Sequence, residues 1–142
     1  MDTPIALSTL PSYVWTAPTT LQCGFPSPAE DHAEQRLDLS SLLIQQQDAT
    51  FFMRVRGASM RDAGIDDGDL VVIDRSVNAK HGQIVVAVVD GEFTIKRLYK
   101  KRNQVRLEAA NPTYPNIELK DGQELVIWGV VTWTLKKHSH GV

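Results

Sequence analysis

Residues 84–99 read Ile-Val-Val-Ala-Val-Val-Asp-Gly-Glu-Phe-Thr-Ile-Lys-Arg-Leu-Tyr, and this stretch decides the fold. The six residues before Asp90 are all apolar, which is typical of a central strand. Asp90-Gly91 is the strongest short hairpin signal, because such turns favour Asp or Asn followed by glycine. The stretch therefore predicts two antiparallel strands, 84–89 and 92–99, joined by a two-residue turn.

Further short strands are expected on both sides of this hairpin. They are identified by alternation of apolar and polar residues or by a continuous apolar run, and they cover 51–56, 70–73, 104–109 and 125–133. In the last of them, Gly129 is expected to mark a bulge or a bend. Short strands with a turn signal about every ten residues predict a mostly β domain, a barrel or a sandwich.

The N-terminal part of the chain has a different character. Residues 1–20 contain three prolines and no helical or strand period, so we expect an arm that is extended or weakly docked. A helical turn is expected at 29–35, and a short helix at 41–45 with Asp38 or Ser40 as its cap. The predicted parts are an N-terminal arm, a linker with the short helix, a β-rich domain and a frayed tail: 1–23, 24–50, 51–135 and 136–142.

Composition limits the function classes. The chain has 142 residues and a formal net charge of −2, so it lacks the basic footprint of a DNA-binding surface. A single cysteine, Cys23, excludes an internal disulfide and a CxxC metal site. No run approaches the roughly 18 apolar residues of a membrane span, and Asp2 with no early Lys or Arg makes a poor signal peptide. We therefore expect a cytoplasmic protein.

Two residues form a candidate catalytic pair. Ser59, in Gly57-Ala58-Ser59-Met60-Arg61-Asp62, follows the strand at 51–56 and opens a short turn. Lys96 lies inside an apolar strand, on the same face as Thr94 and Leu98, and is a candidate for the dry pocket that a working base requires. A serine on a turn and a buried lysine are the two parts of a Ser–Lys nucleophile–base pair.

Each of these residues also has a simpler interpretation. Ser59 fits the S-x-x-D capping pattern of a helix N-terminus, a role compatible with neighbouring N–H groups that hold an oxyanion. Lys96 could bury only its stem and keep its ammonium in water. A base must be neutral, and an unperturbed lysine pKa of about 10.4 leaves only about one amine in two thousand neutral at pH 7.

Histidines offer a competing site. His81 could serve Ser59 together with Asp74, but Ser59 lacks the G-x-S-x-G elbow that such hydrolases use. His138 and His140 have no Cys or His partners at metal-ligand spacing. We interpret all of these as surface histidines and expect no metal and no cofactor.

The segment 23–28 reads Cys-Gly-Phe-Pro-Ser-Pro. Its two prolines force an extended backbone, the conformation in which proteases take substrates by β-strand addition. The alternative is a proline-rich linker without a function of its own.

Five segments in this order resemble the LexA/UmuD family of self-cleaving Ser–Lys peptidases, family S24, and in particular its UmuD branch in SOS mutagenesis. They are 23–28, 35–39, 57–60, 64–70 and 89–96, within a similarity that runs from about 21 to 133. The resemblance implies a LexA/UmuD-like β domain behind a flexible arm. It also implies a serine endopeptidase that cuts its own chain.

The resemblance assigns roles to individual residues and partners. Ser59 would be the nucleophile, Lys96 the general base, the N–H groups of Ala58 and Ser59 the oxyanion donors, and Cys23–Gly24 the scissile bond. RecA filaments on single-stranded DNA would stimulate cleavage. The shortened homodimer would then join UmuC in an error-prone translesion polymerase, with replicative polymerase subunits as further possible partners, and without direct contact with nucleic acid or membrane.

Two alternatives remain open. One is a LexA-like repressor fragment, which is disfavoured because only 23 residues precede the expected cut and a helix-turn-helix needs more. The other is a non-catalytic β-barrel interaction module in which Ser59 is only a helix cap.

Overall fold

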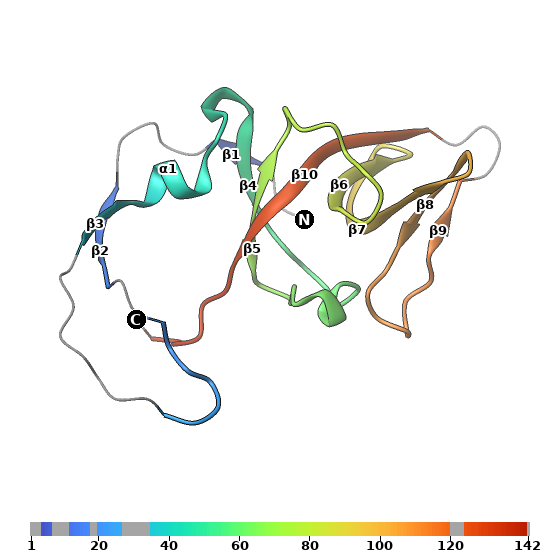
Figure 1. The fold of residues 1–142 in the computed structure, drawn as a ribbon. Helices are drawn as coiled ribbons and strands as arrows, with labels where there is room; N and C mark the ends of the chain where they lie inside the picture. Colours follow the sequence, from blue (N-terminus) through green and yellow to red (C-terminus); the bar gives the residue numbers. More distant parts are fainter. Residues whose placement is uncertain (1–3, 7–11, 18–19, 27–34, 120–123, 142) are drawn as a thin grey trace.

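The computed structural model describes residues 4–6, 12–17, 20–26, 35–119 and 124–141. Eight strands form one antiparallel sheet that curls around its own core, while a smaller two-stranded sheet and a short helix stand to one side (Figure 1). The prediction of a mostly β fold is confirmed.

The large sheet has eight strands, and each neighbouring pair is antiparallel. In spatial order they are β1 (Ile5–Ala6), β4 (Thr50–Arg54), β5 (Leu70–Asp74), β10 (Leu125–Leu135), β6 (Ile84–Val89), β7 (Glu92–Lys101), β8 (Gln104–Glu108) and β9 (Ile117–Glu118). The long strand β10 crosses the middle of the domain and joins its two halves (Figure 1). All the strands predicted between 51 and 135 are present, with ends shifted by a few residues.

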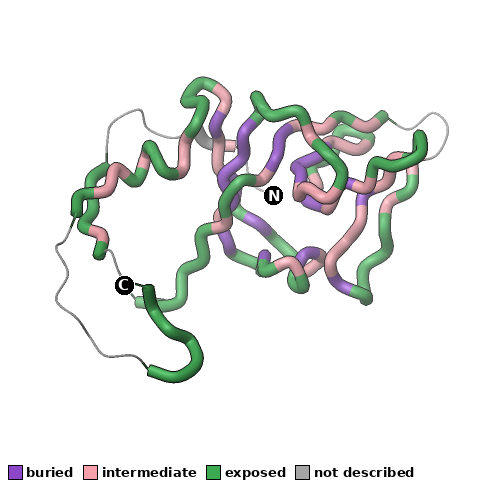
Figure 2. Tube along the Cα trace, in the orientation of Figure 1, coloured by how far each residue is buried: buried purple, intermediate pink, exposed green. Residues whose placement is uncertain are grey.

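Two clusters of buried side chains fill the sheet. The first lies around β4 and β5 and consists of Met53, Val55, Met60, Ile65, Val71, Ile73, Val86 and Ile95. The second lies around β6 to β8 and consists of Val85, Ala87, Leu98, Leu107 and Val130. Figure 2 shows the buried residues concentrated in these strands and the arm exposed. The core therefore belongs to the domain that follows the arm.

Two short turns with positive φ angles pair the consecutive strands β6, β7 and β8. Asp90 and Gly91 have φ angles of 48° and 83°, as a mirror-image two-residue turn requires, and this confirms the predicted hairpin of β6 and β7. Arg102 and Asn103 have φ angles of 52° and 62° and connect β7 to β8 in a similar way.

Gly129 lies at a bulge, as predicted. The pairing of β10 with β6 shifts register between Ile127 and Gly129. A Cβ atom at Gly129 would lie 2.5 Å from Cγ2 of Ile73, so β10 crosses β5 at a distance that only glycine allows.

For residues 1–20 the sequence predicted an extended or weakly docked arm, and it did not reveal that parts of this arm form strands. β1 adds to the free edge of β4, and β2 (Tyr13–Thr16) pairs with β3 (Gln35–Asp38) in a separate two-stranded sheet. These strands are only two to four residues long. Segments this short show no period, because their pairing depends on partners elsewhere in the chain.

The helix prediction was correct in kind but displaced. α1 spans Leu39–Leu43, and its cap is Asp38, whose carboxylate accepts from the Ser40 amide and from Ser41 Oγ. The helical turn expected at 29–35 falls mostly outside the described residues, and Gln35 begins β3. Among the described residues, no helix combines the length and apolar character that a membrane crossing requires.

The expectation of a frayed tail was wrong for its first residue. Lys136 Nζ donates to carboxylate oxygens of Asp66 and Asp69, and Asp69 is buried. The end of β10 is thus fastened to the loop that precedes β5.

Candidate active site

The turn that carries Ser59 is held from several sides. Gly57 has a φ of 92°, a conformation that favours glycine, and its N–H donates to Asp67 Oδ1 at 2.7 Å. Met60, directly after the serine, is 1% exposed and packs in the first core cluster. The serine is therefore held between a turn that requires glycine and a buried methionine.

The predicted capping role of Ser59 is wrong. The helix after it is a single 3₁₀ turn, η2 (Arg61–Ala63), whose N-terminal cap is Met60, without a side-chain capping bond. Ser59 precedes this cap residue, and its hydroxyl is bonded to another partner.

That partner is Lys96. Lys96 lies in β7 and is only 8% exposed. Its Nζ is 2.9 Å from Ser59 Oγ and donates also to Thr94 Oγ1 and to the Ile95 carbonyl, each at 3.0 Å. The structure thus brings together the two side chains that the sequence singled out, and Thr94 shares their face as the strand pattern predicted.

Burial sets the electrostatics of this lysine. Desolvation lowers the pKa of Lys96 below its usual 10.5. Among the described residues, no carboxylate lies within ion-pair distance of Lys96 Nζ to oppose this effect. The environment therefore shifts Lys96 toward the neutral amine, the form that can take a proton, relative to an exposed lysine.

Backbone carbonyls beside Ser59 are all engaged. The Ala58 carbonyl accepts from the Arg61 amide at 3.2 Å and from Asn111 Nδ2 at 2.8 Å, and the Ser59 carbonyl accepts from the Ala110 amide at 2.7 Å. Within the described part of the chain, the amides of Ala58 and Ser59 donate to no protein acceptor. Two fixed N–H groups next to the hydroxyl can therefore receive an external oxygen.

The sequence did not reveal Asn111 as part of this site. An Asn-Pro pair favours a turn, and residues 111–115 form a loop. The side chain is buried, and its Oδ1 accepts from the amide and the hydroxyl of Thr113, which closes an Asx turn. The turn was readable from the sequence, but the contact with Ala58, 53 residues away, was not.

The competing histidine site is not formed. His81 is exposed, its Nδ1 accepts from the Lys100 amide, and its ring packs edge-on against Tyr99. The Asp74 carboxylate instead accepts from the amide and the hydroxyl of Ser76. In the described ranges, no group of three or more His, Cys, Asp or Glu side chains is arranged to hold a metal ion.

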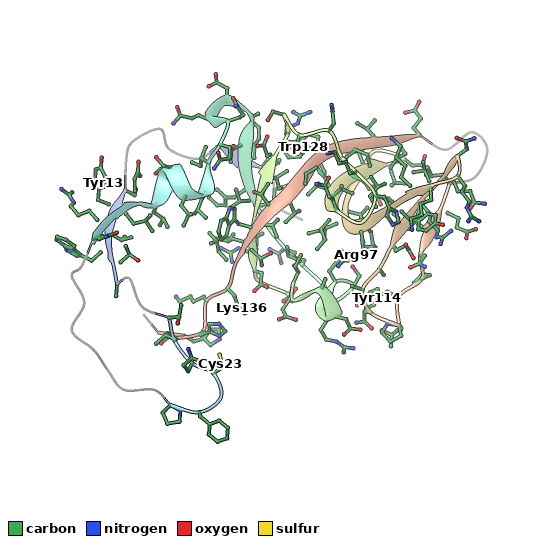
Figure 3. All side chains as sticks on the ribbon, in the orientation of Figure 1. Tyr13, Cys23, Arg97, Tyr114, Trp128 and Lys136 are labelled. Atoms are coloured by element: carbon green, nitrogen blue, oxygen red, sulfur yellow. The ribbon has the colours of Figure 1, made fainter. Side chains whose placement is uncertain are left out.

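The expected cleavage bond is not at Ser59 in this conformation. Cys23 is exposed, and beyond its chain neighbours no described atom lies within 4 Å of a Cβ built on Gly24. In Figure 3, Cys23 lies on the arm, at the other side of the view from Tyr114, whose loop borders the Ser59 turn. The arm would have to move to bring this bond to the serine.

Comparisons with known proteins agree with the mostly β fold. The sequence model described as Peptidase S24-like matches residues 15–132. The chain is 47% identical to "Protein ImpA" of Salmonella typhimurium over 116 residues, which are 82% of this chain and 79% of that protein. It is 43% identical to "Protein SamA" of S. typhimurium strain LT2, over 92% of this chain and 87% of that protein. It is also 37% identical to the "LexA repressor" of Paracidovorax citrulli, over 80% of this chain and 50% of that protein.

Proposed function

The chain belongs to the Peptidase S24-like family, and from this premise we propose that it is a serine endopeptidase that cuts its own backbone between Cys23 and Gly24. The family membership confirms the resemblance read from the sequence. In the proposal, Ser59 is the nucleophile, Lys96 is the general base, and the amides of Ala58 and Ser59 hold the oxyanion.

One observation carries the proposal, namely the set of partners around Lys96 Nζ. A neutral amine has two N–H donors and one lone pair. Two of its three partners, Thr94 Oγ1 and the Ile95 carbonyl, accept hydrogen bonds, and the third is the Ser59 hydroxyl at 2.9 Å. The neutral amine therefore fits this pocket, with its lone pair directed at the proton that it must remove.

The chemistry follows in two stages. Lys96 Nζ takes the Ser59 proton as Oγ attacks the carbonyl carbon of Cys23, and the resulting oxyanion accepts from the two amides. Collapse breaks the Cys23–Gly24 bond, and the Lys96 ammonium gives its proton to the departing Gly24 amine. A water molecule, deprotonated by Lys96, then attacks the acyl-enzyme and releases a fragment that ends at Cys23, which leaves Ser59 protonated again.

The length of the linker permits this reaction. About 25 residues separate Gly24 from β4, and an extended chain spans roughly 3.3–3.6 Å per residue. The bond can thus reach Ser59 of its own protomer or of the second protomer in a homodimer. The glycine after the bond admits the close approach of a nucleophile.

The family match and the relatives support an SOS-related role for the chain, so we infer that the proposed activity belongs to the response to DNA damage. We expect RecA filaments on single-stranded DNA to stimulate the cut. The product, 24–142, is expected to act as a homodimer with a UmuC-type translesion polymerase and to meet replicative polymerase subunits. The net charge of −2 fits this division of labour, in which the partners contact the DNA.

The test is a time course of mass spectra on the purified full-length chain at about pH 10. The mass should fall by that of residues 1–23, more slowly at pH 7, and faster when RecA filaments are added. Ser59→Ala and Lys96→Ala should remain intact, whereas Lys80→Ala, an exposed lysine away from the site, should be cut normally. If Ser59→Ala is cut at the same bond and rate, the assigned nucleophile is wrong.

A further inference from the structure

Asn111 lies behind the Ser59 turn, on the loop that follows β8. We propose that Asn111 is a positioning residue for the oxyanion site, which aims the Ser59 amide at the developing negative charge. This inference rests on the proposed peptidase function and adds to it a residue that does not touch the reacting atoms.

The geometry of the peptide unit carries the argument. The Ala58 carbonyl and the Ser59 N–H belong to one planar peptide group, and in a trans peptide they point in opposite directions. A side chain that holds the carbonyl therefore also sets the direction of the N–H. Asn111 Nδ2 holds this carbonyl at 2.8 Å, which is shorter than the 3.2 Å bond from the Arg61 amide.

The orientation of the Asn111 amide is itself determined. Its oxygen accepts from the Thr113 amide at 3.1 Å, and a backbone N–H can only donate. Nδ2 must consequently face Ala58. Asn111 is 5% exposed, so water does not compete for this contact.

The backbone next to Asn111 supports the same turn. The Ala110 amide donates to the Ser59 carbonyl, and the Asp62 amide donates to the Ala110 carbonyl, both at 2.7 Å. With the Asn111 bond, these form three contacts between the loop after β8 and the turn of the nucleophile. Only the Asn111 contact comes from a side chain, so it can be removed by substitution.

Loss of a whole oxyanion donor lowers catalytic rates by about 100-fold to 1,000-fold. In an Asn111 variant the Ser59 amide remains but is less well aimed, and the Arg61 amide still holds the Ala58 carbonyl. We therefore expect a smaller loss, about 10-fold to 100-fold in the rate of self-cleavage.

The experiment measures the first-order rate of self-cleavage of the full-length chain between pH 7 and pH 11. Asn111→Ala removes the whole side chain, whereas Asn111→Asp keeps an acceptor for Thr113 but loses the donor to Ala58. Asn116→Ala is the matched control, because Asn116 Oδ1 accepts from the Ala109 amide in the same loop without contacting Ala58. Melting temperatures are recorded for all four chains, and rates are taken well below the lowest of them.

Both Asn111 variants should show a plateau rate about 10-fold to 100-fold lower at high pH, with the midpoint of the pH profile unchanged because Lys96 is untouched. Asn116→Ala should keep the plateau of the unmodified chain. The inference is overturned if Asn111→Asp cleaves at the unmodified rate, if the midpoint moves instead of the plateau, or if all three variants lose rate in step with melting temperature. An unmodified chain that is never cut would instead remove the proposed function.

Discussion

Replacing Lys96 with methionine should change how the stability of the protein depends on pH. Methionine has a similar length and no charge, so it removes the ionisable group from the pocket. Burial lowers the pKa of Lys96 in the folded chain, whereas in the unfolded chain the lysine returns to about 10.5. Between these two values the unfolded state binds more protons than the folded state, and the free energy of unfolding must rise with pH.

The size of the effect follows from linkage. One proton difference gives a slope of at most about 1.4 kcal/mol per pH unit. At a pH below the folded-state pKa of Lys96, the free energy of unfolding of the unmodified chain is reduced by the full cost of burying an ammonium. Above pH 10.5 this cost is absent. The free energy of unfolding of the unmodified chain minus that of Lys96→Met should therefore be lowest near neutral pH and should increase toward pH 10.5.

The assay is urea unfolding of both chains at several pH values. Both should carry Ser59→Ala, so that self-cleavage does not interfere, and other titrating groups cancel in the difference. A difference that stays constant between pH 7 and pH 10.5 would refute a lowered pKa for Lys96. A difference that decreases with pH would mean that an unrecognised anion stabilises the ammonium, and the argument for a neutral base would fail.

Two further substitutions test other contacts. Gly129→Ala should lower the free energy of unfolding by about 1–3 kcal/mol in chemical denaturation, because its Cβ would meet Cγ2 of Ile73 at 2.5 Å. Gly24→Ala is the control, since open space surrounds Gly24, and it should change nothing measurable. Equal stabilities of the two variants would contradict the packing argument. Thr94→Val keeps the shape of the side chain but removes a hydrogen-bond acceptor of Lys96 Nζ, and this bond contributes about 1 kcal/mol. Self-cleavage in a gel time course should therefore be slower by roughly 5-fold to 10-fold. An unchanged rate would exclude a role for the Thr94 hydroxyl in orienting the amine.

Much of the β domain could be predicted because its signals are local. The Asp90-Gly91 turn and the apolar runs on either side of it depend only on neighbouring residues. Strands β1 and β2 could not be found, because two to four residues show no period and are ordered by pairing with β4 and β3. The tail was misjudged for the same reason, since Lys136 is held by carboxylates that are about 70 residues away in sequence.

The residues of the candidate site also differ in how far the sequence could reveal them. Ser59 and Lys96 were paired because a serine on a turn and a lysine in an apolar strand are the two parts of a Ser–Lys pair, and the resemblance to the LexA/UmuD family then assigned their roles. The capping interpretation of Ser59 failed because the pattern of residue types does not fix where a one-turn helix begins. Asn111 was missed because its chemistry depends on a backbone carbonyl, and every residue has one.

The location of the parts has a consequence for the proposed reaction. The nucleophile turn, the strand with Lys96 and the loop with Asn111 all follow Gly24, so a cut after Cys23 would leave the catalytic groups in the product. A chain would then be cut once because its substrate is lost and not because its site is destroyed. The same cut would release β1 and leave the edge of β4 without its neighbouring strand. An exposed strand edge is suited to pairing with another chain, so one bond cleavage would both end the reaction and uncover a new surface.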